Sequence, residues 1–196
     1  MSIYLLFIQH IMFSLKEGGK AAVVVPTGFI TAAHGIELKI RKKLVEENWI
    51  AGVVSMPSNI FATTSTNVSI LFIDKGVNDT VVLVDASNLG TMSKEGKNQK
   101  TLLSHEEEQH IVDTFNSRQT VEGFSVVVDY DAITSRNYSL SAGQYFEARI
   151  KYSDITPTQF AEKVGNHNDR LAAMFDESRK LEAEITKRIA GLRFND

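Results

Sequence analysis

Side chains that commonly carry chemistry are sparse in this sequence. Its 196 residues include no cysteine, which excludes disulfides and thiolate metal sites. His105 and His110 lie five residues apart in a polar segment, without the spacing of metal ligands, and we interpret the other histidines as surface or capping residues: His10, His34 and His167. No serine stands in a Gly-x-Ser-x-Gly setting. Gly18-Gly19 follow a predicted helix and precede a strand, the wrong order for a phosphate-binding turn. We therefore predict no metal site and no catalytic nucleophile.

One loop has a composition suited to ligand binding. Pro57 to Asn67 joins two apolar strands and places Ile60 and Phe61 among threonine and serine residues. Loops at strand ends of α/β sheets are common ligand sites. From the residues alone, ordinary loop packing is the favoured interpretation of Phe61. The alternative is a stacking platform for a base turned out of a DNA duplex.

The elements that would position this loop alternate between helix and strand. Helical spacing and apolar runs predict a helix, a strand, a helix and three strands, in this order: Ile3–Leu15, Lys20–Pro26, His34–Asn48, Trp49–Met56, Val68–Lys75 and Val81–Asp85. The β-branched run before Pro26 is typical of a strand buried on both faces in a parallel sheet. We expect the last three strands to pair as neighbours. We therefore predict an α/β fold that forms the second half of a mixed, mostly parallel sheet with antiparallel strands. The apolar start of the chain suggests that upstream elements are missing.

The helix predicted from His34 to Asn48 has an apolar stripe along Ile36, Ile40 and Leu44. Its basic residues occupy the other faces, and we interpret them together as a solvated surface: Lys39, Arg41, Lys42 and Lys43. A role in phosphate binding is the alternative.

The second half of the chain changes character after residue 150. Asn88–Lys100 is predicted to be a loop, Ser104–Ser117 a helix with a capping box, Phe124–Val128 a strand, and Tyr130–Phe146 irregular. From Thr156 the chain is helical, and Leu171, Met174, Leu181, Ile185 and Leu192 recur at spacings of three and four, with Ser178 and Arg188 on the same seam. We predict a domain over residues 1–150 and a docking tail over 151–196. The seam requires a partner surface, either on its own domain or on another subunit.

The net charge of −3 argues against tight DNA binding by this chain alone, because phosphate contacts usually need a basic excess. The sequence shows neither a signal peptide nor a stretch long enough to span a membrane. Together with the absence of cysteine, this favours the cytoplasm.

Several segments resemble the later motifs of N6-adenine DNA methyltransferases, most of all the modification (M) subunit of type I restriction-modification systems: Ala21–Phe29, Val53–Phe61, Asn67–Lys75, Val84–Ser87 and Tyr138–Phe146. The resemblance covers about Leu5 to Tyr152. It implies a Rossmann-like sheet that ends in an antiparallel hairpin. It also implies methyl transfer from S-adenosylmethionine to the exocyclic amine of adenine.

The sequence departs from this family at the catalytic tetrapeptide of type Asn/Asp-Pro-Pro-Phe/Tyr. Its three prolines, Pro26, Pro57 and Pro157, are never adjacent, and the glycine-rich cofactor motif is absent as well. In the family both lie upstream of the segment matched here. We therefore expect the C-terminal half of the subunit, with no bound S-adenosylmethionine and no activity alone.

By the same resemblance, Phe61 would stack on the flipped adenine. Residues expected near the base or the DNA backbone are Asn59, Thr63, Thr64, Ser65, Thr66 and Asn67. The implied partners are a specificity subunit, a second M subunit, a restriction subunit and double-stranded DNA bound through the complex. The C-terminal helix would dock on the specificity subunit.

Two other hypotheses remain open. The chain is either such an enzyme part or a non-catalytic assembly module that binds a specificity-type subunit. A methyltransferase acting on RNA or protein is a weaker third reading. In addition, the sheet edge where upstream strands would pair suggests dimerisation through that edge.

Overall fold

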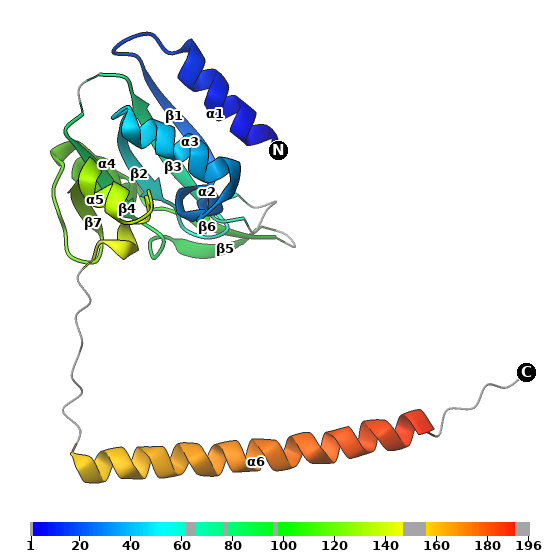
Figure 1. The fold of residues 1–196 in the computed structure, drawn as a ribbon. Coiled ribbons are helices and arrows are strands. Elements are labelled where there is room, and N and C mark those ends of the chain that lie inside the picture. Colours follow the sequence, from blue (N-terminus) through cyan, green and yellow to red (C-terminus); the bar gives the residue numbers. More distant parts are fainter. Residues whose placement is uncertain (1, 62–65, 77, 96–97, 147–155, 191–196) are drawn as a thin grey trace, which may run out of the picture. The chain divides into compact units, whose positions relative to one another are not determined.

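The computed structural model describes residues 2–61, 66–76, 78–95, 98–146 and 156–190. It divides into two compact units, residues 1–147 and 148–196, which are described separately. The first unit contains a mixed sheet with helices, and the second is one long helix (Figure 1). The α/β fold class with a C-terminal helix is thus confirmed. Among the described helices, none is long and apolar enough to cross a membrane.

The main sheet has five strands in the order β1-β3-β2-β4-β7. Their bounds are Lys20–Pro26 (β1), Ile50–Ser55 (β2), Val68–Asp74 (β3), Thr80–Asp85 (β4) and Ser125–Asp129 (β7). β3 runs antiparallel to both β1 and β2, so β1 and β2 point the same way. β4 is parallel to β2, and β7 is antiparallel to β4. The expected antiparallel hairpin is β2–β3.

Three details of the predicted sheet are wrong. The described sheet is mixed but not mostly parallel, because β2 with β4 is its one parallel pairing and the other three are antiparallel. β1 is not a central parallel strand: its one partner among the described strands is the antiparallel β3, and its side chains alternate between partly buried and exposed until Val25. Val24 remains 49% exposed. β4 does not pair with β3 but lies on the far side of β2, because β3 is inserted between β1 and β2. Apolar content alone does not distinguish an edge strand from a central one.

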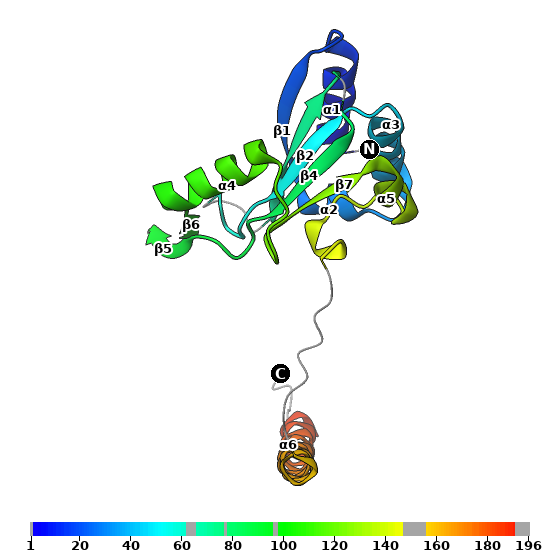
Figure 2. The same ribbon diagram turned by 90° about the vertical axis from the view of Figure 1, so that its left-hand side faces the viewer.

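Helices cover both faces of the sheet (Figure 2). On one face lie α1 (Ile3–Ser14), α2 (Thr27–Thr31), α3 (Gly35–Glu46) and α5 (Tyr130–Ser135). Their buried side chains, such as Leu5, Phe29 and Leu44, form one core with the sheet. On the other face α4 (His105–Ser117) packs Phe115 against Phe72 of β3, with 4.5 Å between ring centroids. The sheet is therefore the middle of three layers.

The residues expected to form a loop from Asn88 to Lys100 contain a hairpin instead. β5 (Thr91–Glu95) and β6 (Asn98–Leu102) pair antiparallel as a separate two-stranded sheet. The region from Tyr130 to Phe146, expected to be irregular, contains α5 and a short 3-10 helix, Ala142–Gln144. Both predictions were wrong because short elements with polar faces give weak sequence periodicity.

The two helix ends predicted from sequence signals are confirmed. Ser104 caps α4 by accepting the backbone N–H of Glu107, whose side chain accepts the backbone N–H of Ser104 in return. The last helix, α6 (Pro157–Ala190), begins at Pro157, where a missing N–H costs nothing.

Candidate functional site

The carboxyl ends of three parallel strands meet at one edge of the main sheet. β1, β2 and β4 run in the same direction and end at Pro26, Ser55 and Asp85. In open α/β sheets, the loops at this edge form the usual ligand site. The loop from Pro57 to Asn67 leaves β2 at this edge, which confirms that it follows a strand end.

Backbone hydrogen bonds fix both ends of this loop. Where the loop meets the sheet, the N–H of Met56 donates to the carbonyl of Val68 at 3.0 Å. The N–H of Thr27, at the start of α2, donates to the carbonyl of Asn67 at 2.9 Å. The loop after β2 is thereby joined to the segment after β1.

A third anchor comes from the β5–β6 hairpin. Thr101, which is buried, donates its hydroxyl to the carbonyl of Ser58 at 2.7 Å and its N–H to the carbonyl of Asn59 at 2.9 Å. Asn59 itself has a left-handed backbone, with φ of 55°, a conformation that asparagine tolerates better than most residues. Sequence reasoning missed Thr101 because it assigned the hairpin to a mobile loop.

Phe61 follows these anchors directly and is 47% exposed. The ring is thus partly packed against the protein and partly open to solvent. Thr66 and Asn67 are also exposed. Thr63, Thr64 and Ser65 lie outside the described residues. The described part of the loop offers an apolar ring, hydroxyls and amides, a set suited to binding a base.

The segment after β1 is held by a buried arginine. Arg41 of α3 is fully buried, and its three guanidinium nitrogens donate to the carbonyls of Phe29, Ala32 and Tyr138. Burial lowers the pKa of Arg41 to about 10. The prediction that Arg41 belongs to a solvated basic face is wrong, whereas Lys39, Lys42 and Lys43 are exposed as expected. A helical position adjacent to the apolar stripe allowed Arg41 to turn inward.

Asp85, at the end of β4, is an acidic side chain at this edge, but the described residues there do not gather into a metal site. No three His, Cys, Asp or Glu residues come together as a metal site within the described ranges. Asp85 accepts the N–H of Ser87 at 3.0 Å, and the segment that follows β1 holds a single glycine, Gly28, within Pro26–Phe29. These residues do not supply the glycine-rich turn that binds S-adenosylmethionine in the resembled family.

Comparisons with known proteins agree on the family. The family model described as N-6 DNA Methylase matches residues 2–153. The MpnII methylase subunit of a type I restriction enzyme from Mycoplasma pneumoniae is 33% identical over 92% of this chain and 32% of its own length. The HindI methylase subunit from Haemophilus influenzae is 26% identical over 96% of this chain and 43% of its own length. The chain thus spans between a third and a half of the length of these relatives.

Solved structures give the same result. The methyltransferase subunit of a type I restriction-modification system from Streptococcus thermophilus superposes with a TM-score of 0.66 and 26% identity, covering 74% of this chain and 31% of that one. The EcoKI M protein, at 21% identity and a TM-score of 0.56, shows the same fold over 99% of this chain and 48% of that one. The resemblance to type I modification subunits is therefore confirmed, and the chain belongs to the N-6 DNA methylase family.

Proposed function

We propose that this chain forms the C-terminal part of a type I modification subunit that transfers a methyl group from S-adenosylmethionine to N6 of adenine in DNA. The observation that carries the proposal is Phe61, exposed on an anchored loop at the carboxyl edge of a methyltransferase sheet. Phe61 stacks on the flipped adenine, and Asn59, Thr66 and Asn67 lie beside the base or its phosphates. Thr63, Thr64 and Ser65 belong to the same proposal.

The remaining chemistry belongs to other parts of such a subunit. The Pro-Pro tetrapeptide that holds the amine and the turn that binds the cofactor are supplied outside residues 1–196. We therefore propose that this chain alone binds no S-adenosylmethionine and transfers no methyl group.

The open edge of β1 and the exposed face of α1 support the proposal that another part of the subunit packs on the first unit. β1 leaves one edge unpaired among the described strands, and α1 exposes four large apolar side chains while burying Leu5, Ile8 and Met12. The exposed ones are Ile3, Leu6, Phe7 and Phe13, with Phe13 88% exposed. An apolar face of this size normally indicates an interaction surface. The upstream strands of the methyltransferase sheet pair along β1 and cover α1, in place of a second copy of this chain.

The second unit supplies the docking surface. α6 carries an apolar stripe with no buried residue, as expected for a helix that packs on another subunit. This exposed stripe also favours the alternative function, a non-catalytic module that binds a specificity-type subunit. In either case DNA and the restriction subunit are reached through the assembled complex, in the cytoplasm.

Methyl transfer from labelled S-adenosylmethionine to DNA of many sequences tests the proposal. The assay compares this chain alone with a mixture that adds the upstream half and a specificity subunit. We expect activity only in the mixture. Activity of this chain alone would contradict the proposal that the catalytic groups lie outside residues 1–196. An inactive mixture beside an active intact control complex would favour the assembly module.

The same mixture tests Phe61. Base–aromatic stacking contributes about 1–3 kcal/mol, so Phe61→Ala is expected to weaken binding of the target DNA roughly 5- to 150-fold. Phe61→Tyr keeps the ring and should remain close to wild type, whereas Phe61→Leu keeps apolar volume without a π-face and should resemble Phe61→Ala. Equal binding by the leucine and tyrosine variants would show that stacking is not the role of Phe61.

A further inference from the structure

The second unit is a helix whose apolar side chains have no partner within that unit. α6 runs for 34 residues and none of its side chains is buried. Eight large apolar side chains on it are each between 40% and 62% exposed: Phe160, Val164, Leu171, Met174, Phe175, Leu181, Ile185 and Ile189. An isolated amphipathic helix gains most of its stability from packing its apolar face. The spacing of the apolar residues along this face indicates which kind of partner would cover it.

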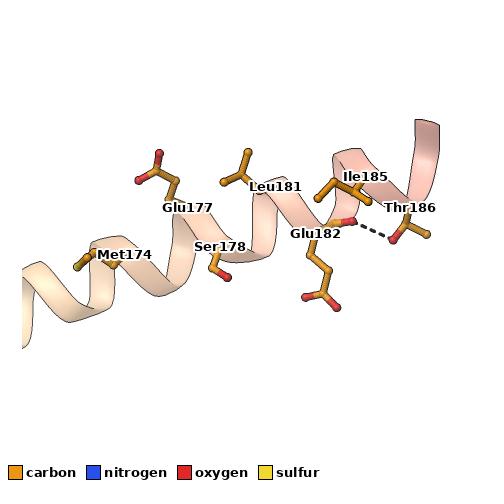
Figure 3. Close-up of a pocket in the computed structure, with 7 residues that line it drawn as sticks. All are labelled: Met174, Glu177, Ser178, Leu181, Glu182, Ile185 and Thr186. Carbon is orange, nitrogen blue, oxygen red and sulfur yellow. Dashed lines mark hydrogen bonds between the residues drawn. The ribbon is translucent and has the colours of Figure 1, made fainter. Parts of the chain in front are cut away.

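Six of these eight side chains follow a heptad repeat, and Phe175 and Ile189 lie beside it, each directly after a core position. Starting at Phe160, the core positions alternate in steps of four and three residues through Arg188: Phe160, Val164, His167, Leu171, Met174, Ser178, Leu181, Ile185 and Arg188. A sustained 4-3 alternation is typical of a two-stranded coiled coil. Three core positions are polar, and their placement limits how a partner helix can align. Figure 3 shows Glu177 and Glu182 pointing to opposite sides of this seam.

We propose that α6 pairs with α6 of a second copy of this chain as an antiparallel coiled coil, with Leu171 of one copy opposite Met174 of the other. This inference rests on the proposed docking role of α6, but not on the methyl-transfer reaction. The alignment then determines every other core pair: Val164 with Leu181, Phe160 with Ile185, and His167 with Ser178. Apolar residues meet apolar residues, and the two polar side chains within the overlap meet each other. Arg188 falls beside Pro157 of the other copy, at the solvent-exposed end.

The flanking charges support the same alignment. Each heptad has two core positions, and the first ones here are Val164, Leu171, Ser178 and Ile185. In an antiparallel pair, the residue directly before such a position on one helix faces the residue directly before such a position on the other helix. Here these residues are Lys163, Arg170, Glu177 and Glu184. In the proposed register Lys163 lies opposite Glu184, and Arg170 opposite Glu177. By symmetry all four contacts on this flank are between opposite charges, whereas on the other flank Phe175 lies opposite Asn168 and Ala161 opposite Glu182.

Other alignments create conflicts. A parallel pair places Arg188 against Arg188 in the core and Glu177 beside Glu182, and like charges at such positions select against pairing. An antiparallel pair shifted by one heptad places Leu171 on His167 and Ser178 on Phe160. The opposite shift places Ile185 on His167 and Val164 on Arg188. Of the three antiparallel registers compared, the proposed one alone pairs no polar core residue with an apolar one inside the overlap.

Cysteine cross-linking in the full chain tests the geometry. The natural sequence has no cysteine, so each introduced thiol is unique. Mixed Val164→Cys and Leu181→Cys chains, one carrying a size tag, should form the mixed disulfide under mild oxidation. Either variant alone should give little dimer. Val164→Cys with Met174→Cys reports the shifted register and should cross-link weakly. Efficient cross-linking of Val164→Cys to itself would overturn the antiparallel arrangement.

Charge reversal tests the pairing in solution by analytical ultracentrifugation. Lys163→Glu with Arg170→Glu should weaken self-association at least tenfold, and so should Glu177→Lys with Glu184→Lys. An equimolar mixture of the two double variants should restore wild-type affinity. Lys180→Glu with Lys187→Glu makes the same change in net charge on the outer face of the helix and should have little effect.

Two results would overturn the proposal. A dimer that all charge reversals leave intact would be formed elsewhere, for example through the edge of β1. A chain that stays monomeric at high concentration, but whose α6 binds a specificity-type subunit, would show that the seam fits that partner instead. Neither result depends on catalysis, so the methyltransferase proposal would stand or fall separately.

Discussion

Replacing Arg41 by methionine should destabilise the first unit strongly, although α3 would keep its length and helical propensity. The variant retains an unbranched apolar stem but removes the guanidinium that joins α3 to the carbonyls of Phe29, Ala32 and Tyr138. A buried carbonyl that loses its donor costs about 1–3 kcal/mol. The bond to Phe29 is buried and the bonds to Ala32 and Tyr138 are part-buried, so the three together cost at most roughly 3–9 kcal/mol. Removing a desolvated cation returns several kcal/mol, which leaves a net loss of about 3 kcal/mol.

The single tryptophan gives the assay. Trp49 packs against the main core of the first unit, so its fluorescence during urea unfolding reports this unit and not α6. Arg41→Lys keeps the charge but loses the planar fork, and it should be nearly as destabilised as Arg41→Met. Lys39→Met alters an exposed position of the same helix and is the matched control. If Arg41→Met lowered the free energy of unfolding by less than about 1 kcal/mol and matched this control, the hydrogen bonds of the guanidinium would not be what stabilises this part of the fold.

Three further perturbations follow from the packing. Gly52→Ala should lower the free energy of unfolding in urea by about 1–3 kcal/mol, because the new Cβ would lie 2.5 Å from the carbonyl oxygen of Val82. Gly28→Ala is the control, since its new Cβ meets no atom within 4 Å. Equal stability of the two variants would contradict the contact at Gly52. Tyr130→Phe should lower the free energy of unfolding by about 1 kcal/mol, because it loses a 2.7 Å hydrogen bond to a main-chain carbonyl of β2. The hydroxyl is buried, which raises the pKa of Tyr130 to about 12. An unchanged unfolding midpoint would refute this prediction. Glu107 accepts two backbone N–H groups that lower the pKa of its carboxyl below its usual 4.5, so it stabilises the fold above that pH and loses the effect as the pH falls through the lowered pKa. Glu107→Gln should therefore be less stable than wild type at pH 6 and converge with it once the pH lies below the lowered pKa, and a gap that persists at low pH would contradict this assignment.

Predictions from sequence were reliable where the signal lay in consecutive residues. The bounds of α1, α3, β2 and β3 agree with their predicted ranges to within one or two residues, because each is long enough to show a period. The loop carrying Phe61 was likewise recognised from its two flanking strands. The capping box at Ser104 was recognised because its two residues lie three apart.

Predictions failed where the deciding contact lies far away in the sequence. The edge position of β1 depends on its pairing with β3, and the burial of Arg41 depends on the distant carbonyl of Tyr138. The β5–β6 hairpin was missed because its strands are short and largely polar, which gives a weak alternation signal. Thr101 was therefore not connected with the loop that it anchors.

The insertion of β3 between β1 and β2 also orders events during synthesis. Lys20 pairs with Asp74, so β1 has left the ribosome well before its partner is made. At about 5–20 residues per second, this delay lasts roughly 3–10 s. Throughout that interval the apolar run Val23–Val25 has no native partner among the described strands, and β2 can pair with neither neighbour until β3 and β4 emerge. The speed of translation through residues 27–67 therefore sets how long this edge of β1 waits for its partner β3.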